Sequence, residues 1–272
     1  MLIKIAQFEL RYQLRNPIFS IAVILFALLV FKASTGPNSI GMGPGVHRNA
    51  PYKIAQLYLM LSVLYMFVSA AFVSNVIVRD DRTGFGPIVR ATRISKSQYL
   101  FGRYLGAFLA AAVGFLAIPA ALWLATLMPW LDPTGLEPNR LPAYLVPYLS
   151  IALPNLFLTS ALFFSLATMT RSTVATYLGV VSLLVLWAAG VALTGGQGAL
   201  AAYVDPLGFS AVAHLTRYWT PVELNTLSTP IYGVLLWNRI IWIATGAAFL
   251  GLAYARFRFS TGTSRAARGR KG

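Results

Sequence analysis

The sequence contains no cysteine, only two histidines and only seven acidic residues among 272 positions. The absence of cysteine excludes disulfide bonds, thiolate nucleophiles and cysteine-ligated metals. The two histidines, His47 and His214, lie in separate loop segments, so we expect neither to bind a metal. An enzyme needs a nucleophile and base, or metal ligands, converging at one place. The sequence therefore does not favour catalytic chemistry on this chain.

Charge of either sign is scarce, at 11% of residues, whereas 57% are hydrophobic and the mean hydropathy is +0.68. A soluble domain of this length needs more polar residues to cover its surface, but lipid accepts apolar side chains outside every helix. Apolar runs of about twenty residues favour helices over barrel strands of about ten. We predict an all-α integral membrane protein, with one domain over residues 1–259 and a disordered basic tail over 260–272.

Six apolar runs predict six transmembrane helices. We expect Pro119 to kink the third helix and Pro154 with Asn155 to be the most disturbed point of the fourth, because proline removes a backbone donor. In the sixth, we expect Asn238 and Arg239 to reach back to the lipid headgroups. The predicted spans are residues 18–31, 56–78, 104–127, 144–168, 174–193 and 234–254.

Two further segments have helical signals but are too polar to span. Residues 2–15 place Lys4, Arg11 and Arg15 on one face at spacings of seven and four, which predicts a helix at headgroup level. Residues 199–233 are rich in Tyr, Trp and Leu, a composition typical of short helices at the outer interface.

Lysine and arginine are unevenly distributed along the chain. When successive connections between the spans are assigned to alternate sides of the membrane, most lysines and arginines fall on the side of the two termini and the loop around Arg79. By the positive-inside rule, both termini are cytoplasmic in a multi-pass protein of the cell (inner) membrane. The net charge of +15 then points to membrane lipid rather than nucleic acid as the partner of the basic segments.

The loop between the second and third spans, residues 78–103, combines acids, arginines and turn residues. A sharp reversal at Gly84 and Gly86 and a proline suited to a first helical position predict a short transverse helix over 87–93. Ser95 and Gln98 predict a capping box for the helix that leads into the third span. Such a loop can bind a protein partner, or serve only as a positive-inside anchor.

The chain resembles the permease subunits of ABC transporters of the ABC-2 type, which have six spans per subunit. The similarity covers nearly the whole chain, from the N-terminal helix and its Asn16-Pro17 boundary onward. After the second span it follows the pattern acid-x-x-G, then T-x-[IVL]-S-[KR]-x-x-Y-L-x-G-[KR]. These positions are Asp81, Gly84, Thr92, Ile94, Ser95, Lys96, Tyr99, Leu100, Gly102 and Arg103.

The resemblance implies a permease of a type V exporter that pairs with a second permease and is driven by two cytosolic ATP-binding subunits. No G-x-x-x-x-G-K-[ST] motif occurs, so ATP and Mg²⁺ would be held by the partner and no cofactor by this chain. Residues 79–108 most resemble a branch fused to or accompanying an M1-type aminopeptidase. This chain has no H-E-x-x-H motif, so such a peptidase would be a separate subunit.

The contact with the ATP-binding subunit is implied to involve the loop after the second span and the N-terminal helix. Its predicted residues are Asp80, Asp81, Gly84, Phe85, Gly86, Pro87, Ile88, Arg90, Arg93, Ser95, Glu9 and Arg11. A possible substrate path is marked by polar or helix-disturbing residues within the spans, namely Asn75, Pro154 and Asn155.

Other functions stay open at this point. One is a non-transporting anchor or assembly subunit for a complex that includes an external peptidase. Another is an ion-coupled carrier, which needs ionisable groups within the membrane. All seven acids fall in loops or interfacial segments of the predicted topology: Glu9, Asp80, Asp81, Asp132, Glu137, Asp205 and Glu223.

Overall fold

The computed structural model describes residues 1–36, 45–82, 94–196 and 198–257, and the side chains within these ranges except those of residues 81 and 82. Every regular element in these ranges is helical, and six segments are long and apolar enough to cross a membrane. The predicted all-α, six-helix fold is therefore confirmed. The expected helix at 87–93 and the tail at 260–272 lie outside the described residues. The six segments are Pro17–Thr35, Pro51–Asp80, Lys96–Ala125, Leu141–Thr170, Thr173–Thr194 and Gly233–Arg256.

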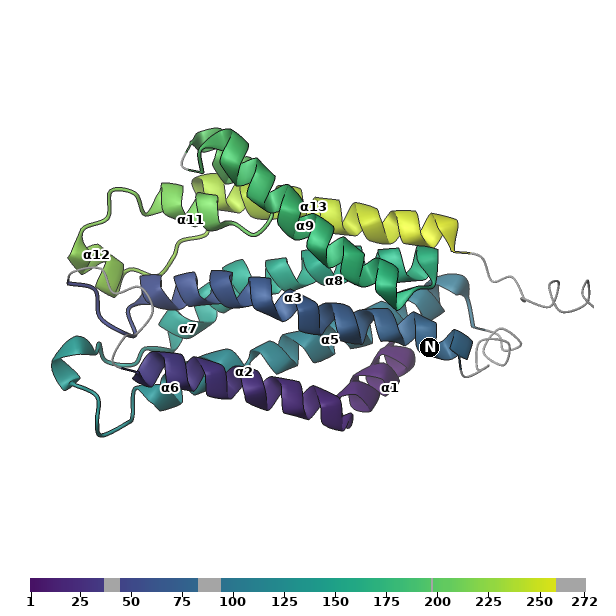
Figure 1. The fold of residues 1–272 in the computed structure, drawn as a ribbon, viewed down its shortest axis with the longest axis horizontal. Coiled ribbons are helices and arrows are strands. Elements are labelled where there is room, and N and C mark those ends of the chain that lie inside the picture. The colour runs from purple at the N-terminus through teal and green to yellow at the C-terminus, as the bar shows by residue number, and fades with distance from the viewer. Residues whose placement is uncertain (37–44, 83–93, 197, 258–272) are drawn as a thin grey trace, which may run out of the picture.

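The helices form an elongated bundle (Figure 1). Helix α1 and the last turn of α13 lie at one end, which we call the α1 end; the short helix α12 lies at the other, the α12 end. In chain order the elements are α1 (Leu2–Leu14), α2 (Pro17–Thr35), α3 (Pro51–Arg82), α5 (Lys96–Phe115), α6 (Ala117–Ala125), η1 (Pro133–Gly135), α7 (Leu141–Pro147), η2 (Tyr148–Ala152), α8 (Leu153–Thr170), α9 (Thr173–Thr194), α10 (Ala199–Val204), α11 (Phe209–Leu215), α12 (Pro221–Thr226) and α13 (Gly233–Arg256).

Two predicted helix starts are confirmed by their caps. At the start of α5, the Ser95 hydroxyl accepts the N–H of Gln98 at 3.2 Å, and the Gln98 side chain accepts the N–H of Ser95 at 3.3 Å. At the start of α2, the Asn16 side chain accepts the N–H of Ile18 at 3.0 Å, and Pro17 takes the first helical position. Local sequence therefore determines both boundaries.

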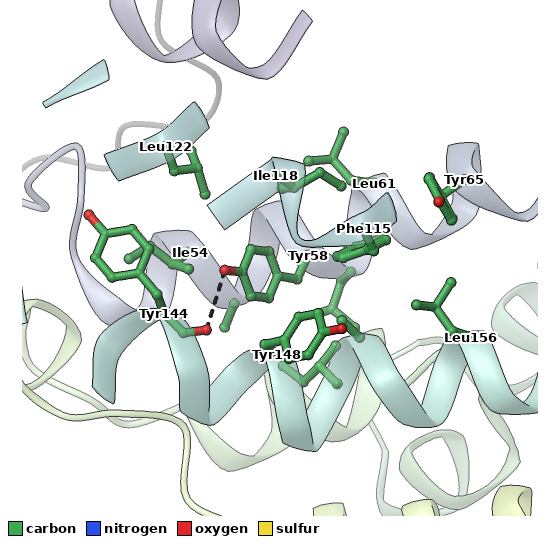
Figure 2. Packing of buried hydrophobic residues seen from close by; sticks show 14 of the residues in the cluster. Ile54, Tyr58, Leu61, Tyr65, Phe115, Ile118, Leu122, Tyr144, Tyr148 and Leu156 are labelled. Carbon is green, nitrogen blue, oxygen red and sulfur yellow. Dashed lines mark hydrogen bonds between the residues drawn. The ribbon is translucent and has the colours of Figure 1, made fainter. Parts of the chain in front are cut away.

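The core between α3, the α5–α6 pair and the α7–α8 segment is rich in aromatic rings (Figure 2). Tyr58 and Tyr148 both pack against Phe115, with ring centroids 5.9 Å and 6.3 Å apart. The Tyr58 hydroxyl donates to the carbonyl of Tyr144 at 3.3 Å (Figure 2). Large rings whose hydroxyl groups donate to backbone carbonyls stabilise this region without leaving those hydroxyls unpaired.

The third membrane-length helix breaks between α5 and α6, as the proline predicts. The break lies at Leu116, three residues before Pro119. The N–H of Leu116 bonds to the carbonyl of Val113 and not to that of Ala112. The hydroxyl of Tyr148 instead donates to the Ala112 carbonyl at 2.8 Å. The carbonyl released by the kink is thus satisfied from a neighbouring helix.

The fourth membrane-length helix is disturbed just before Pro154, close to the predicted point. The π-helical segment η2, Tyr148–Ala152, separates α7 from α8. A wider helical turn accommodates a position whose N–H is missing. The predicted irregularity is therefore confirmed to within one turn.

Candidate functional site

Buried charges gather at the α1 end, beside the two ends of the undescribed segment 83–93. Glu9 of α1, Asp80 of α3 and Arg103 of α5 are at most 4% exposed. One nitrogen of the Arg103 guanidinium, Nη1, lies 2.5 Å from Oε2 of Glu9. The other, Nη2, lies 2.7 Å from Oδ2 of Asp80. A single side chain thus bridges the helices α1 and α3.

Three more side chains complete this arrangement. Arg79 donates to Oε2 of Glu9 at 2.9 Å, and its Nε is 3.8 Å from Oδ1 of Asp80. The hydroxyl of Tyr99 donates to Asp80 at 2.7 Å, and the Gln13 amide donates to Glu9 at 3.1 Å. Two carboxylates face two guanidinium groups, so the formal charges cancel. We call Glu9, Arg79, Asp80, Tyr99 and Arg103 the charge cluster.

Glycines of α5 allow α1 to approach closely enough to form the cluster. A Cβ at Gly106 would lie 2.5 Å from the carbonyl oxygen of Ala6 and 2.6 Å from Cβ of Glu9. A Cβ at Gly102 would lie 2.9 Å from Cβ of Ile5. These distances are too short for any larger residue without a shift of α1. The two glycines, one turn apart, are therefore part of the reason that Glu9 reaches Arg103.

The residues predicted to contact a partner fall into three groups. Glu9 and Asp80 are buried in the charge cluster, so they position helices and do not form an exposed contact surface. Arg11 and Ser95 are exposed. The rest lie outside the described side chains: Asp81, Gly84, Phe85, Gly86, Pro87, Ile88, Arg90 and Arg93. The cluster itself was not predicted, although Glu9 on the otherwise apolar face of α1 was a signal for it.

A second buried cation lies in α13, nearer the α12 end. Nη1 of Arg239 donates to the Asn155 amide oxygen at 2.7 Å, and Nε donates to the Asn238 amide oxygen at 3.0 Å. The Asn238 nitrogen donates to the carbonyls of Ala202 at 2.7 Å and Asp205 at 2.8 Å. The prediction that Asn238 and Arg239 reach the headgroups is wrong. The segment containing α10 and α11 covers them and provides hydrogen-bond acceptors.

The turn between α10 and α11 is shaped around this cation. Asn155 donates to the carbonyl of Leu207 at 3.0 Å, and Asp205 accepts the N–H of Leu207 at 2.9 Å. Gly208 has a φ of 87°, and a Cβ there would overlap the guanidinium of Arg239. Left-handed backbone and close approach both favour glycine. Asn155 thus holds α8, α13 and the turn together.

The residues predicted to mark a substrate path are not gathered in one place. Asn75 is exposed on α3, Pro154 is partly buried and Asn155 is enclosed by its hydrogen bonds. A cavity of about 660 Å³ lies between α8, α9, α10 and α13, and none of these three residues lines it. Its wall is mostly apolar and includes Trp187, Trp242 and the one carboxylate of Asp205.

Across the ranges that the structure describes, no three His, Cys, Asp or Glu side chains are placed to hold a metal ion together. The charge cluster joins α1, α3 and α5 at the α1 end of the bundle. Its geometry supports a mechanical linkage between α1, α3 and α5. Comparison of the sequence with models of protein families and with curated proteins found no match.

Proposed function

We propose that this chain is the transmembrane permease subunit of an ATP-driven exporter of the ABC-2 type, coupled to separate ATP-binding subunits. The observation that carries the proposal is the charge cluster, which ties α1 to α3 and α5, the two helices that flank residues 83–93 in the sequence. Removing one partner of a buried ion pair costs about 3–5 kcal/mol, so such clusters resist separation. Force applied to α1 or to 83–93 would therefore move the three helices together.

In this proposal the α1 end faces the cytosol of a cell (inner) membrane. Exposed cations at that end include Lys4, Arg11, Arg15 and Arg256. Their number supports the orientation, because cytoplasmic segments are enriched in lysine and arginine. The segments α10 to α12 would then lie at the external surface.

The proposed partner proteins have different roles. ATP and Mg²⁺ would be bound by the ATP-binding subunits, which would contact residues 83–93. A second permease, of the same or a different sequence, would pair through sparsely buried helices. In α2 and in α9, only 11% of the residues in the most apolar 18-residue stretch are buried. Both helices are therefore available for such contacts. An M1-type aminopeptidase is a further partner suggested by the resemblance.

The first test is co-expression of the tagged chain with the products of the adjacent reading frames, followed by purification and an ATPase assay. We expect an ATP-binding subunit to co-purify in stoichiometric amount. The variant R90E/R93E should lose the subunit or its stimulated ATP hydrolysis. The matched control R140E/R217E, which reverses two exposed charges at the α12 end, should retain both.

Three results would contradict the proposal. If the chain purifies without any ATP-binding protein and the R90E/R93E variant keeps full function, the chain is better described as an anchor or assembly subunit. Transport that collapses with the ion gradient and ignores ATP depletion would identify a carrier. Because the chain has no cysteine, single cysteines also test the orientation. Impermeant maleimide should label R217C but not T170C in intact cells, and the reverse pattern would refute the cytosolic placement of the α1 end.

A further inference from the structure

The outward face of α1 forms a cleft with the start of α2. Its volume is about 590 Å³, and its wall contains Lys4, Arg11 and Arg15, the rings of Phe8 and Tyr12, and the Asn16-Pro17 junction. The three cations are exposed. They lie on the side of α1 opposite to Ala6, Glu9 and Gln13, which are buried against the bundle. The cleft is therefore open to the surroundings of the protein.

Nothing acidic neutralises these cations in the described part of the chain. No acid lines the cleft, and Lys4, Arg11 and Arg15 form no ion pair among the described residues. The single acid of α1, Glu9, is already paired with Arg79 and Arg103 on the other face. The cleft thus has an uncompensated positive charge of three.

Apolar surface lies directly beside this charge. The rings of Phe8 and Tyr12 stack with centroids 6.4 Å apart, and the Arg79 guanidinium lies 3.9 Å from the Tyr12 ring centroid. Beyond the junction, Ile18 is 67% exposed and Ile21 is 57% exposed on α2. A cationic region that continues into an exposed apolar helix matches a ligand with an anionic head and a hydrocarbon chain.

We propose that this cleft binds the headgroup of an anionic phospholipid, with an acyl chain along the exposed side of α2. Arg11 and Arg15 are one turn apart, so both side chains bind the same phosphate group. Lys4 is about 10 Å from Arg11 along the helix axis, at 1.5 Å per residue. Its ammonium group therefore binds a second negative group of the lipid. A phospholipid with two phosphates therefore binds more tightly than one with a single phosphate. The site does not depend on the proposed exporter function.

The same helix carries the charge cluster on its other face. A lipid held by Lys4, Arg11 and Arg15 would press α1 toward α5 and keep Glu9 beside Arg103. Anionic lipid therefore stabilises the docked position of α1, whereas a zwitterionic lipid lacks the net charge to do so. This links membrane composition to the part of the bundle that the charge cluster holds together.

The test is lipid binding by the purified full chain, measured by native mass spectrometry with phosphatidylglycerol, cardiolipin and phosphatidylcholine. Each cation near an anionic lipid contributes about 5-fold in affinity, so K4Q/R11Q/R15Q should bind anionic lipid roughly 100-fold more weakly. The single variant R11Q should show a loss of about 5-fold, which keeps the test valid if the triple variant is poorly folded. K32Q/R140Q/R217Q removes three exposed cations elsewhere and should bind like the wild type.

Four results would overturn the proposal. Equal binding of phosphatidylcholine and phosphatidylglycerol would remove the role of charge. An equal loss in K32Q/R140Q/R217Q would indicate net charge and not a site. Displacement of phosphatidylglycerol by millimolar inorganic phosphate would identify a free-anion site. Protection of R11C from maleimide by a purified ATP-binding subunit, but not by anionic vesicles, would assign the cleft to a protein.

Discussion

Arg103 of α5 and Glu9 of α1 are 94 positions apart in the sequence, yet their side chains meet with a nitrogen-to-oxygen distance of 2.5 Å. Both are buried, so water does not compete for the contact. The same guanidinium reaches Asp80 of α3. Arg103 therefore joins the N-terminal helix to the two helices that border residues 83–93.

Removal of the Glu9 charge should release α1. In E9Q the buried cluster keeps two guanidinium groups but only one carboxylate, and an unpaired buried charge costs about 3–5 kcal/mol. We expect a lower thermal unfolding midpoint in detergent and faster maleimide labelling of a cysteine at Ala6, which is buried beside α5. The exposed-charge control R217Q should leave both unchanged. Equal labelling rates in E9Q and wild type would refute a structural role for Glu9.

The pairing itself can be measured by a double-mutant cycle. E9Q and R103Q each leave opposite charges without a partner, whereas E9Q/R103Q removes one charge of each sign. We therefore expect the double variant to be less destabilised than the sum of the single variants, by about 0.5–3 kcal/mol. Strict additivity would mean that the two residues do not interact energetically.

Glycine at position 106 should be necessary for the α1–α5 contact. G106A introduces a Cβ 2.5 Å from the Ala6 carbonyl oxygen, so α1 must move and stability should fall. A Cβ at Gly251 of α13 would meet nothing within 4 Å, which makes G251A a matched control. Alanine is favoured over glycine within a helix by up to about 1 kcal/mol, so G251A should be neutral or stabilising. Similar effects of both variants on the unfolding midpoint would contradict the packing.

Asn155 and Asn75 should behave differently, although both were predicted to lie on a substrate path. N155L removes the acceptor for Arg239 and the donor to Leu207, and each unsatisfied buried group costs about 1–3 kcal/mol. N75L changes an exposed position and should leave stability nearly unchanged. Thermal unfolding of the two purified variants checks this. If N75L destabilises the protein as much as N155L does, the buried hydrogen bonds of Asn155 do not explain its contribution to stability.

The cap of α12 should loosen in acid. The backbone N–H and then the hydroxyl of Thr220 hydrogen-bond to Glu223 and lower the pKa of its carboxyl group. Because the folded pKa lies below the unfolded one, the ionised carboxylate stabilises the cap above the unfolded pKa. This contribution is lost as the pH falls through the folded pKa. Hydrogen exchange of the α12 amides should therefore show an acid-dependent loss of protection that is absent in E223Q. An identical profile in E223Q would assign the effect to another group.

Much of the fold follows from local sequence signals. The apolar runs determine the six long helices, and Pro119, Pro154 and the Ser95–Gln98 capping box act within one or two turns of their own position. Such signals depend on covalent geometry and on near neighbours, so the sequence alone contains them. A kink near Pro119 and a disturbance near Pro154 were accordingly expected, and the structure shows them as the break at Leu116 and the π-helical segment η2.

The buried polar clusters depend on contacts that local signals do not contain. Arg239 was expected at the headgroups because a cation in a span usually reaches out. Its guanidinium instead donates to Asn155, 84 positions away in α8, and to the neighbouring Asn238, which in turn donates to the carbonyl of Ala202 in α10. Glu9 was predicted to contact a partner subunit, and its actual partner Arg103 could not be inferred from the local sequence. Tertiary packing decides which polar side chains meet.

The rate of ATP hydrolysis by the complex of this chain with its ATP-binding subunit, reconstituted in membranes, tests the central claim most directly. The account predicts that the subunit co-purifies with both wild type and R103Q, and that permease-stimulated hydrolysis is lost in R103Q because α1, α3 and α5 no longer move as one unit. Undiminished stimulation in R103Q, or the failure of any ATP-hydrolysing subunit to assemble with the wild-type chain, would contradict it.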